Sequence, residues 1–169
     1  RVEGVVGTNA NGERFIAANS IAAAGSGEVQ PLHVTGKALG GGDIGQPPNG
    51  QQGISGSSGL NNIGLLVTTS GRVSGPRVPA GWFYLDDGSG VSDGTGIPGI
   101  YVDAGGLLTP PQGSFATVTG VSSCEWFEGR LVNVLRARTQ DDIRVHSGPD
   151  TPAAQVAGLE MQSNPRHAR

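Results

Sequence analysis

Short runs in which apolar and polar residues alternate recur along the chain, and they predict strands. Five such runs occupy residues 63–74, 81–87, 99–103, 114–126 and 129–145. In the fourth run, Phe115, Thr117, Thr119 and Val121 share one face. Period-two alternation rich in β-branched and aromatic residues is typical of half-buried strands. Gly71, inside the first run, predicts the bend that a small barrel needs at a corner.

The first residues of the chain, RVEGVVGTNANGERFIAANSI at 1–21, predict a further hairpin. Its Val-Glu-Gly-Val at 2–5 matches Val-Thr-Gly-Val at 118–121, and Glu-Arg-Phe-Ile at 13–16 lines up with Gly-Arg-Leu-Val at 129–132. We interpret the match as an internal repeat whose first copy is partial. An isolated hairpin is only marginally stable, so this one must pair with other strands. Its partner could be an earlier part of a longer protein, another chain, or the edge of the complete unit.

Changes in composition and in apolar patterning divide the chain into four segments. Residues 1–34 form the partial repeat, and 35–62, rich in Gly, Ser, Pro and Asn, read as a linker because they offer little apolar surface to bury. Residues 63–146 form the complete unit, and 147–169 form a tail or arm. Within the tail, Thr151 and Pro152 suit the start of a short helix that would either dock on a neighbour or fray.

Composition and charge narrow the class of protein. The chain contains 30 glycines and 11 prolines, which favours an all-β protein with many turns. Its net charge of -3 makes it a poor electrostatic match for a nucleic-acid backbone. A single cysteine, Cys124, excludes a disulfide within the chain. The sequence contains no apolar run long enough for a transmembrane helix.

Three motifs carry a resemblance to a known fold. They are Gly-Arg-Val at 71–73, Phe-Tyr-Leu-Asp-Asp-Gly-Ser-Gly at 83–90, and Val-Thr-Gly-Val at 118–121. The pattern resembles the OB-fold, and more closely the OB-like modules of secreted and surface-associated bacterial proteins, which occur in tandem. The resemblance implies a five-stranded Greek-key barrel preceded by a partial repeat, located outside the cell or at its surface. Residues 104–114, AGGLLTPPQGS, depart from the family and predict a loop where many OB-folds have a helix.

An acidic loop is a candidate metal site. Asp86, Asp87 and Asp93 lie close together in sequence, and calcium prefers oxygen ligands from a flexible loop. The spacing is not that of the twelve-residue calcium loop, and Asp-Gly and Ser-Gly pairs are also ordinary turn residues. The turn is therefore the default interpretation, with calcium as the alternative.

A second candidate site is the face of the predicted sheet. OB-folds that bind single strands stack bases on exposed aromatic side chains beside basic residues. The candidates here are Trp82, Tyr84, Tyr101, Arg72, Arg136 and Arg138. The competing interpretation places the aromatic residues in or beside the core and pairs the arginines with nearby acids.

The sequence favours a non-catalytic protein. Cys124 has no histidine close to it in sequence, although His146 could approach it in the fold, and a lone cysteine in a strand is more often a buried apolar group than a nucleophile.

The leading hypothesis is a structural or binding module of an extracellular or cell-surface assembly, self-associating into filaments by strand or arm exchange. The alternative is an OB-fold domain that binds single-stranded nucleic acid or an oligosaccharide. A third hypothesis is a spacer from a larger secreted enzyme.

Overall fold

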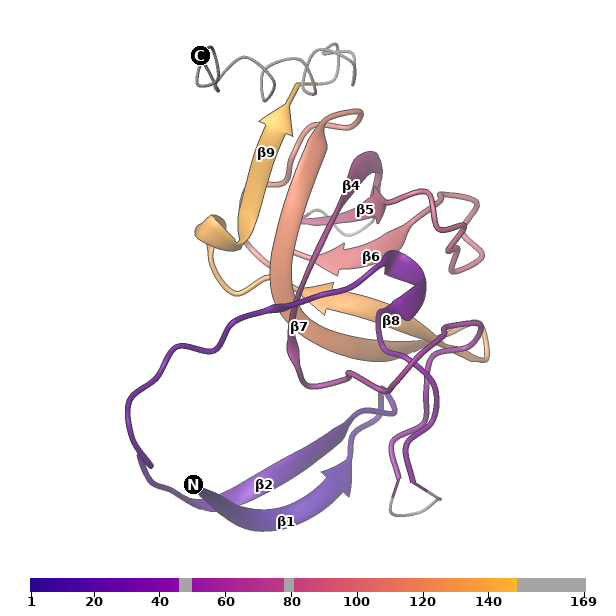
Figure 1. Ribbon diagram of the computed structural model, residues 1–169. Helices are drawn as coiled ribbons and strands as arrows, with labels where there is room; N and C mark the ends of the chain where they lie inside the picture. Colours follow the sequence, from indigo (N-terminus) through magenta and orange to yellow (C-terminus); the bar gives the residue numbers. More distant parts are fainter. Residues whose placement is uncertain (46–49, 78–80, 149–169) are drawn as a thin grey trace, which may run out of the picture.

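The computed structural model describes residues 1–45, 50–77 and 81–148, and within them the protein is all-β, as predicted. It contains a seven-stranded sheet and a separate two-stranded sheet (Figure 1). The predicted helical turn near Thr151 and the rest of the tail from 149 lie outside the described residues. No helix in the described part of the chain is long and apolar enough to cross a membrane.

Within the described residues, nine strands and two short 3-10 helices follow one another. The strands are β1 Val2–Thr8, β2 Arg14–Ile21, β3 Leu32–His33, β4 Leu66–Arg77, β5 Trp82–Asp86, β6 Ile100–Asp103, β7 Phe115–Phe127, β8 Arg130–Arg136 and β9 Ile143–Ser147. The 3-10 helices are η1 Gly36–Ala38 and η2 Gln140–Asp142. The loop predicted at 104–114 connects β6 to β7.

Five of the strands close on themselves. Strand β4 pairs antiparallel with both β5 and β7, β5 pairs with β6, β6 pairs in parallel with β8, and β8 returns to β7. We call this closed set, β4, β5, β6, β8 and β7, the barrel. Strand β3 adds to β4 in parallel. Strand β9 adds to β7 (Figure 1).

Glycines allow the long strands to turn the corners of the barrel. A Cβ atom at Gly71 in β4 would lie 2.5 Å from the carbonyl oxygen of Asp86 in β5. A Cβ at Gly120 in β7 would lie 2.4 Å from the carbonyl oxygen of Arg136 in β8. Because real Cβ atoms do not approach a carbonyl so closely, only glycine fits at either crossing. The bend predicted at Gly71 is thus made by close approach of two strands.

The core of the barrel is built from the inward faces of its strands. The side chains buried there from β4 and β5 are Val67, Val73, Phe83 and Leu85. The remaining members of the cluster from the barrel strands are Ile100, Val102, Ala116, Val118 and Leu135, with Ile143 from β9. The face of β7 named from the sequence, with Phe115, is the outer one, and the inward face carries Ala116 and Val118.

The segment interpreted as a linker, 35–62, is packed against the barrel in its described part. Leu39 follows η1 and is fully buried in the barrel core. Asn62 is buried as well, and its side chain accepts from the N–H of Gly40 and the hydroxyl of Ser122 at 2.8 Å each. Ile54 is buried too, against Cys124 and Leu131, so this polar, glycine-rich segment docks through two apolar side chains and a few satisfied hydrogen bonds.

The last predicted strand, 129–145, is wrong in its extent, because two strands occupy it. Strand β8 ends at Arg136, and η2 turns the chain before β9 begins at Ile143. The break is held by the Asp142 carboxylate, which accepts hydrogen bonds from the backbone and guanidinium of Arg138 and from the N–H of Thr139. The two-residue strand β3 was not predicted, since so short a strand has no alternating pattern.

The docking of residues 35–62 can be tested by a matched pair of substitutions. Leu39→Ala should lower the free energy of unfolding by about 2–5 kcal/mol, because it leaves a cavity in the core. Leu60→Ala, in the same segment but 91% exposed, should change it by less than about 0.5 kcal/mol. Urea unfolding followed by circular dichroism measures both. Equal, small effects would show that the segment does not contribute to the barrel core.

Candidate functional sites: a polar pocket and an exposed hairpin

The aromatic residues predicted to bind a ligand are largely enclosed. Tyr84 and Tyr101 are buried, and their ring centroids lie 6.2 Å apart, with Trp82 4.6 Å from Tyr101. The hydroxyl of Tyr84 donates to the carboxylate of Asp93 at 2.6 Å, so the loop between β5 and β6 is tied over this cluster. The two tyrosines therefore offer no open face on which a base could stack.

The three predicted arginines are separated and engaged. Arg136 donates to Asp103 at 2.7 Å and to the hydroxyl of Ser123 at 3.0 Å. Arg138 forms an ion pair with Asp142 at 2.9 Å, and this hydrogen-bonded guanidinium holds the pKa of Asp142 below its usual value. Arg72 is exposed and donates to a backbone carbonyl at 3.4 Å. The geometry does not gather them into one basic groove.

The predicted acidic cluster is occupied by turn hydrogen bonds. Asp86 accepts from the N–H of Gly88, and the carboxylate of Asp93 also accepts from the N–H and hydroxyl of Thr95. Asp87 accepts from the N–H of Gly36 at 2.6 Å and from both groups of Ser89. Among the described residues, no three side chains of His, Cys, Asp or Glu form a group suited to a metal ion.

The hydrogen bonds to Asp87 outweigh its burial. Burial raises the pKa of this carboxyl, but the bonds from Ser89 and Gly36 together hold it below its ordinary value. The carboxylate is therefore charged where it joins the β5–β6 loop to η1. Its hydrogen bonds therefore connect the barrel to the segment that carries Leu39.

The lone cysteine is buried and protonated. Burial, assisted by the nearby carboxylate of Glu13, raises the pKa of the Cys124 thiol to about 12. Its Sγ donates to the carbonyl of Asn11 at 3.6 Å, while His146 bonds to the hydroxyl of Thr117 at 2.7 Å. A thiol with so high a pKa has a negligible thiolate fraction near neutral pH, which makes it a poor nucleophile.

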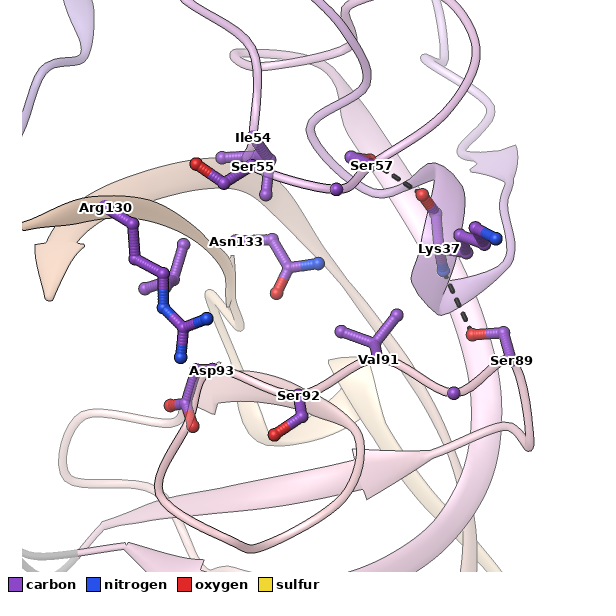
Figure 2. Close-up of a pocket in the computed structure, with 13 residues that line it drawn as sticks. Lys37, Ile54, Ser55, Ser57, Ser89, Val91, Ser92, Asp93, Arg130 and Asn133 are labelled. Atoms are coloured by element: carbon purple, nitrogen blue, oxygen red, sulfur yellow. Dashed lines mark hydrogen bonds between the residues drawn. The ribbon is translucent and has the colours of Figure 1, made fainter. Parts of the chain in front are cut away.

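A pocket of about 330 Å³ lies between the η1 segment, the β5–β6 loop and the start of β8 (Figure 2). Its polar lining is mostly hydroxyl and amide groups, with Ile54, Val91 and Val132 as the apolar part. The polar lining residues are Ser55, Ser57, Ser89, Ser92, Asp93, Arg130 and Asn133, together with Lys37. A concave site with a few polar groups that converge on an apolar floor is typical of small-ligand binding.

Charges in the pocket are arranged at one end. Figure 2 shows the guanidinium of Arg130 on the side of the β5–β6 loop that carries Asp93, and Asn133 in the middle of the lining. The guanidinium lies directly over Gly94, where a Cβ would be 2.0 Å from its nitrogen. Lys37 lines the pocket mainly through its backbone, which bonds Ser57 and Ser89, and its side chain is directed outward (Figure 2).

The second candidate site is the β1–β2 hairpin, which forms its own two-stranded sheet. Its turn is fixed to the barrel. The Gln51 side chain accepts from the N–H of Arg14 at 2.8 Å and donates to the carbonyl of Gly12 at 3.0 Å. Glu13 accepts from the hydroxyl of Ser123 at 2.9 Å. The hairpin is thus held by its tip, and its strands extend away from the barrel (Figure 1).

Apolar side chains cover the projecting part of the hairpin without being buried. The exposed residues range from 44% to 77% and are Val2, Val5, Val6, Phe15, Ile16 and Ile21. Neither strand pairs with a third strand among the described residues. An exposed apolar patch on two unpaired strand edges marks an interaction surface or an aggregation hazard.

Sequence reasoning identified the hairpin but not the pocket. Ser55, Ser92 and Arg130 come from segments far apart in the chain, so no local spacing links them. The only available signal was the Ser-Gly-rich run 89–93, which the Asp-based interpretation had already singled out.

Comparison of the sequence with models of known protein families finds no match, and comparison with curated proteins finds no relative.

Proposed function

We propose that the protein is a non-catalytic structural and binding module that is joined through its β1–β2 hairpin to another barrel of the same kind. The barrel is proposed to be an OB-fold, in a partial tandem arrangement. Support comes from the order β4-β5-β6-β8-β7 closing on β4 and from the parallel pairing of the third and fifth of these strands along the chain, β6 and β8. Location outside the cell or at its surface is part of the proposal and rests on the resemblance described above.

The observation that carries the proposal is the exposed apolar hairpin. In the described structure, hydrogen bonds fix the hairpin at its turn, while six of its large apolar side chains are in solvent. Two such strands bury too little surface to be stable alone. Covering these side chains would gain about 25 cal/mol for each Å² of apolar surface removed from water. The hairpin and β9 lie at opposite ends of the molecule, which suits modules arranged in a row (Figure 1).

If the hairpin is an apolar joining surface, the chain on its own, without the partner barrel, should still associate weakly from hairpin to hairpin as concentration rises, because the same apolar side chains can cover one another. Val6→Lys, in the centre of the exposed face, should abolish this association and leave the melting temperature of the barrel within about 2 °C. Sedimentation velocity over a hundredfold range of concentration, with thermal unfolding of the same samples, measures both quantities.

Leu60→Lys is the matched control, since it introduces the same charge at an exposed leucine outside the hairpin. It should leave the association unchanged. A wild-type chain that remains monomeric throughout, or a Val6→Lys barrel that melts far below the wild type, would contradict the proposal, because the hairpin would then be inert or an internal part of the barrel.

A second candidate function, oligosaccharide binding, is favoured by the polar pocket. Its serine hydroxyls, Asn133 amide, Arg130 guanidinium and Asp93 carboxylate are donors and acceptors suited to sugar hydroxyls. The lining contains no aromatic residue, and the tyrosines are enclosed, which argues against base stacking. The pocket therefore favours a saccharide over single-stranded nucleic acid.

Calorimetric titration with a panel of neutral and acidic oligosaccharides tests this second function. Arg130→Ala should weaken any binding by at least about tenfold, the effect of losing a charge-assisted hydrogen bond. Arg144→Ala, which removes an exposed arginine on β9, should leave the affinity unchanged. Equal losses in the two variants would show that the ligand binds outside the pocket. Preferential binding of an oligonucleotide would contradict the choice of a saccharide as the ligand.

A further inference from the structure

The β1–β2 hairpin resembles the β7–β8 hairpin in structure as well as in its Val-x-Gly-Val motif. In each hairpin the first strand crosses closely over the second at the glycine of this motif. A Cβ at Gly4 would lie 2.1 Å from the carbonyl oxygen of Ala17, the residue that pairs with Val5. In the barrel, a Cβ at Gly120 would lie 2.4 Å from the carbonyl oxygen of Arg136, the residue that pairs with Val121. The glycine of each Val-x-Gly-Val motif therefore occupies the same place at the same crossing.

This crossing sets the structural alignment of the two hairpins. Val5 with Ala17 corresponds to Val121 with Arg136, and Val6 with Ile16 corresponds to Ser122 with Leu135. In the second strand, the sequence match of 13–16 with 129–132 therefore does not coincide with this structural alignment. The reason is the turn, which spans 9–13 in the first hairpin and 128–129 in the second, so the two hairpins differ in length beyond the glycine.

Equivalent positions have opposite exposure. Val118 and Leu135 are fully buried, because β4 and β6 lie against the strands that carry them. Their counterparts Val2 and Ile16 are 49% and 51% exposed. The hairpin therefore presents the inner face of a barrel, and no other strand of the described structure covers that face.

We infer that the partner of the hairpin is a three-stranded sheet of the β4–β6 type, which it completes as a second five-stranded barrel. A β4-like strand pairs antiparallel with β1, with its counterpart of Val67 opposite Gly4 and that of Thr69 opposite Val2, as in β4–β7. A β6-like strand pairs in parallel with β2, with its counterpart of Val102 opposite Ile16. The inference rests on the proposed joining role and specifies its geometry.

The partner sheet is not the one within this barrel. Strands β4 and β6 already hold β7 and β8 along these edges, and Leu39 fills the space inside. Displacing β7–β8 would expose Leu131, Val134 and Leu135, which are fully buried. The complement is a further set of such strands with its own apolar insert.

A fused chain tests the register directly. Residues 35–116 are placed ahead of Arg1, so that Arg1 takes the position of Thr117 and the added strands can reach the hairpin. Cysteines replace Thr69 of the added copy and Val2, which the inferred register sets opposite each other; the buried Cys124 thiol reacts too slowly to interfere. Oxidation followed by peptide mass spectrometry should show the 69–2 disulfide in most molecules.

The control moves one cysteine by one residue, to Thr68, whose side chain would point to the opposite face. It should cross-link at least about tenfold less. Equal cross-linking in both fusions, or none in either, would overturn the inferred geometry. A second fusion that also carries Gly4→Val should lose the 69–2 disulfide, because the crossing has no room for a side chain; its persistence would likewise overturn the inference. Association of the unfused chain is a separate measurement, so failure of the register and failure of the joining role can be told apart.

Discussion

The close approach of two backbones at a glycine is the constraint on which this fold depends. Strand β4 must pair with β5 and with β7, and it can bend between them only because nothing projects from Gly71 toward Asp86. Strand β7 makes the corresponding bend at Gly120. With these two corners in the long strands β4 and β7, the five strands of the barrel close on themselves, and the alternating apolar residues meet inside. The glycine content that appears as low complexity in the sequence is, at these positions, what permits closure.

The same close backbone approach at a glycine also determines the shape of the β1–β2 hairpin. A strand that is bent at a glycine crossing is shaped to wrap around a core, and Gly4 makes β1 such a strand. In β7–β8 the concave face is filled, whereas in β1–β2 it is open to solvent. The tip of the hairpin is nevertheless fixed to the complete barrel by Gln51 and Glu13, so the orientation of any second barrel relative to the first would be set by these contacts.

The fold class and the main strands could be predicted from the sequence because alternation and turn residues are local signals. Gly71 was recognised as a bend for the same reason. The packing of the described part of 35–62 could not be predicted, since its buried apolar side chains, Leu39 and Ile54, stand far apart in sequence and are covered by distant strands of the barrel. The break between β8 and β9 depends on Asp142 folding back onto Arg138, and nothing in the local alternation announces it.

The candidate sites divide in the same manner. The hairpin could be predicted from its local strand-turn-strand pattern, but the exposure of its apolar side chains could not. The burial of Tyr84 and Tyr101 followed from the loop that Asp93 ties down, and the pocket combines side chains from three distant segments. Aromatic and basic residues on predicted strands were plausible as a binding face, but the structure uses most of them to support one another.

Amide hydrogen exchange on the full chain, measured strand by strand, is the most direct test of whether β1–β2 is an open half-barrel. The account predicts that the amides of β7 and β8 exchange only with global unfolding, whereas the amides of β1 and β2 beyond the turn exchange orders of magnitude faster, as in a marginal hairpin. Comparable protection of both hairpins in the dilute, monomeric chain would contradict it, because β1–β2 would then be a completed part of the fold and not an open half of a second barrel.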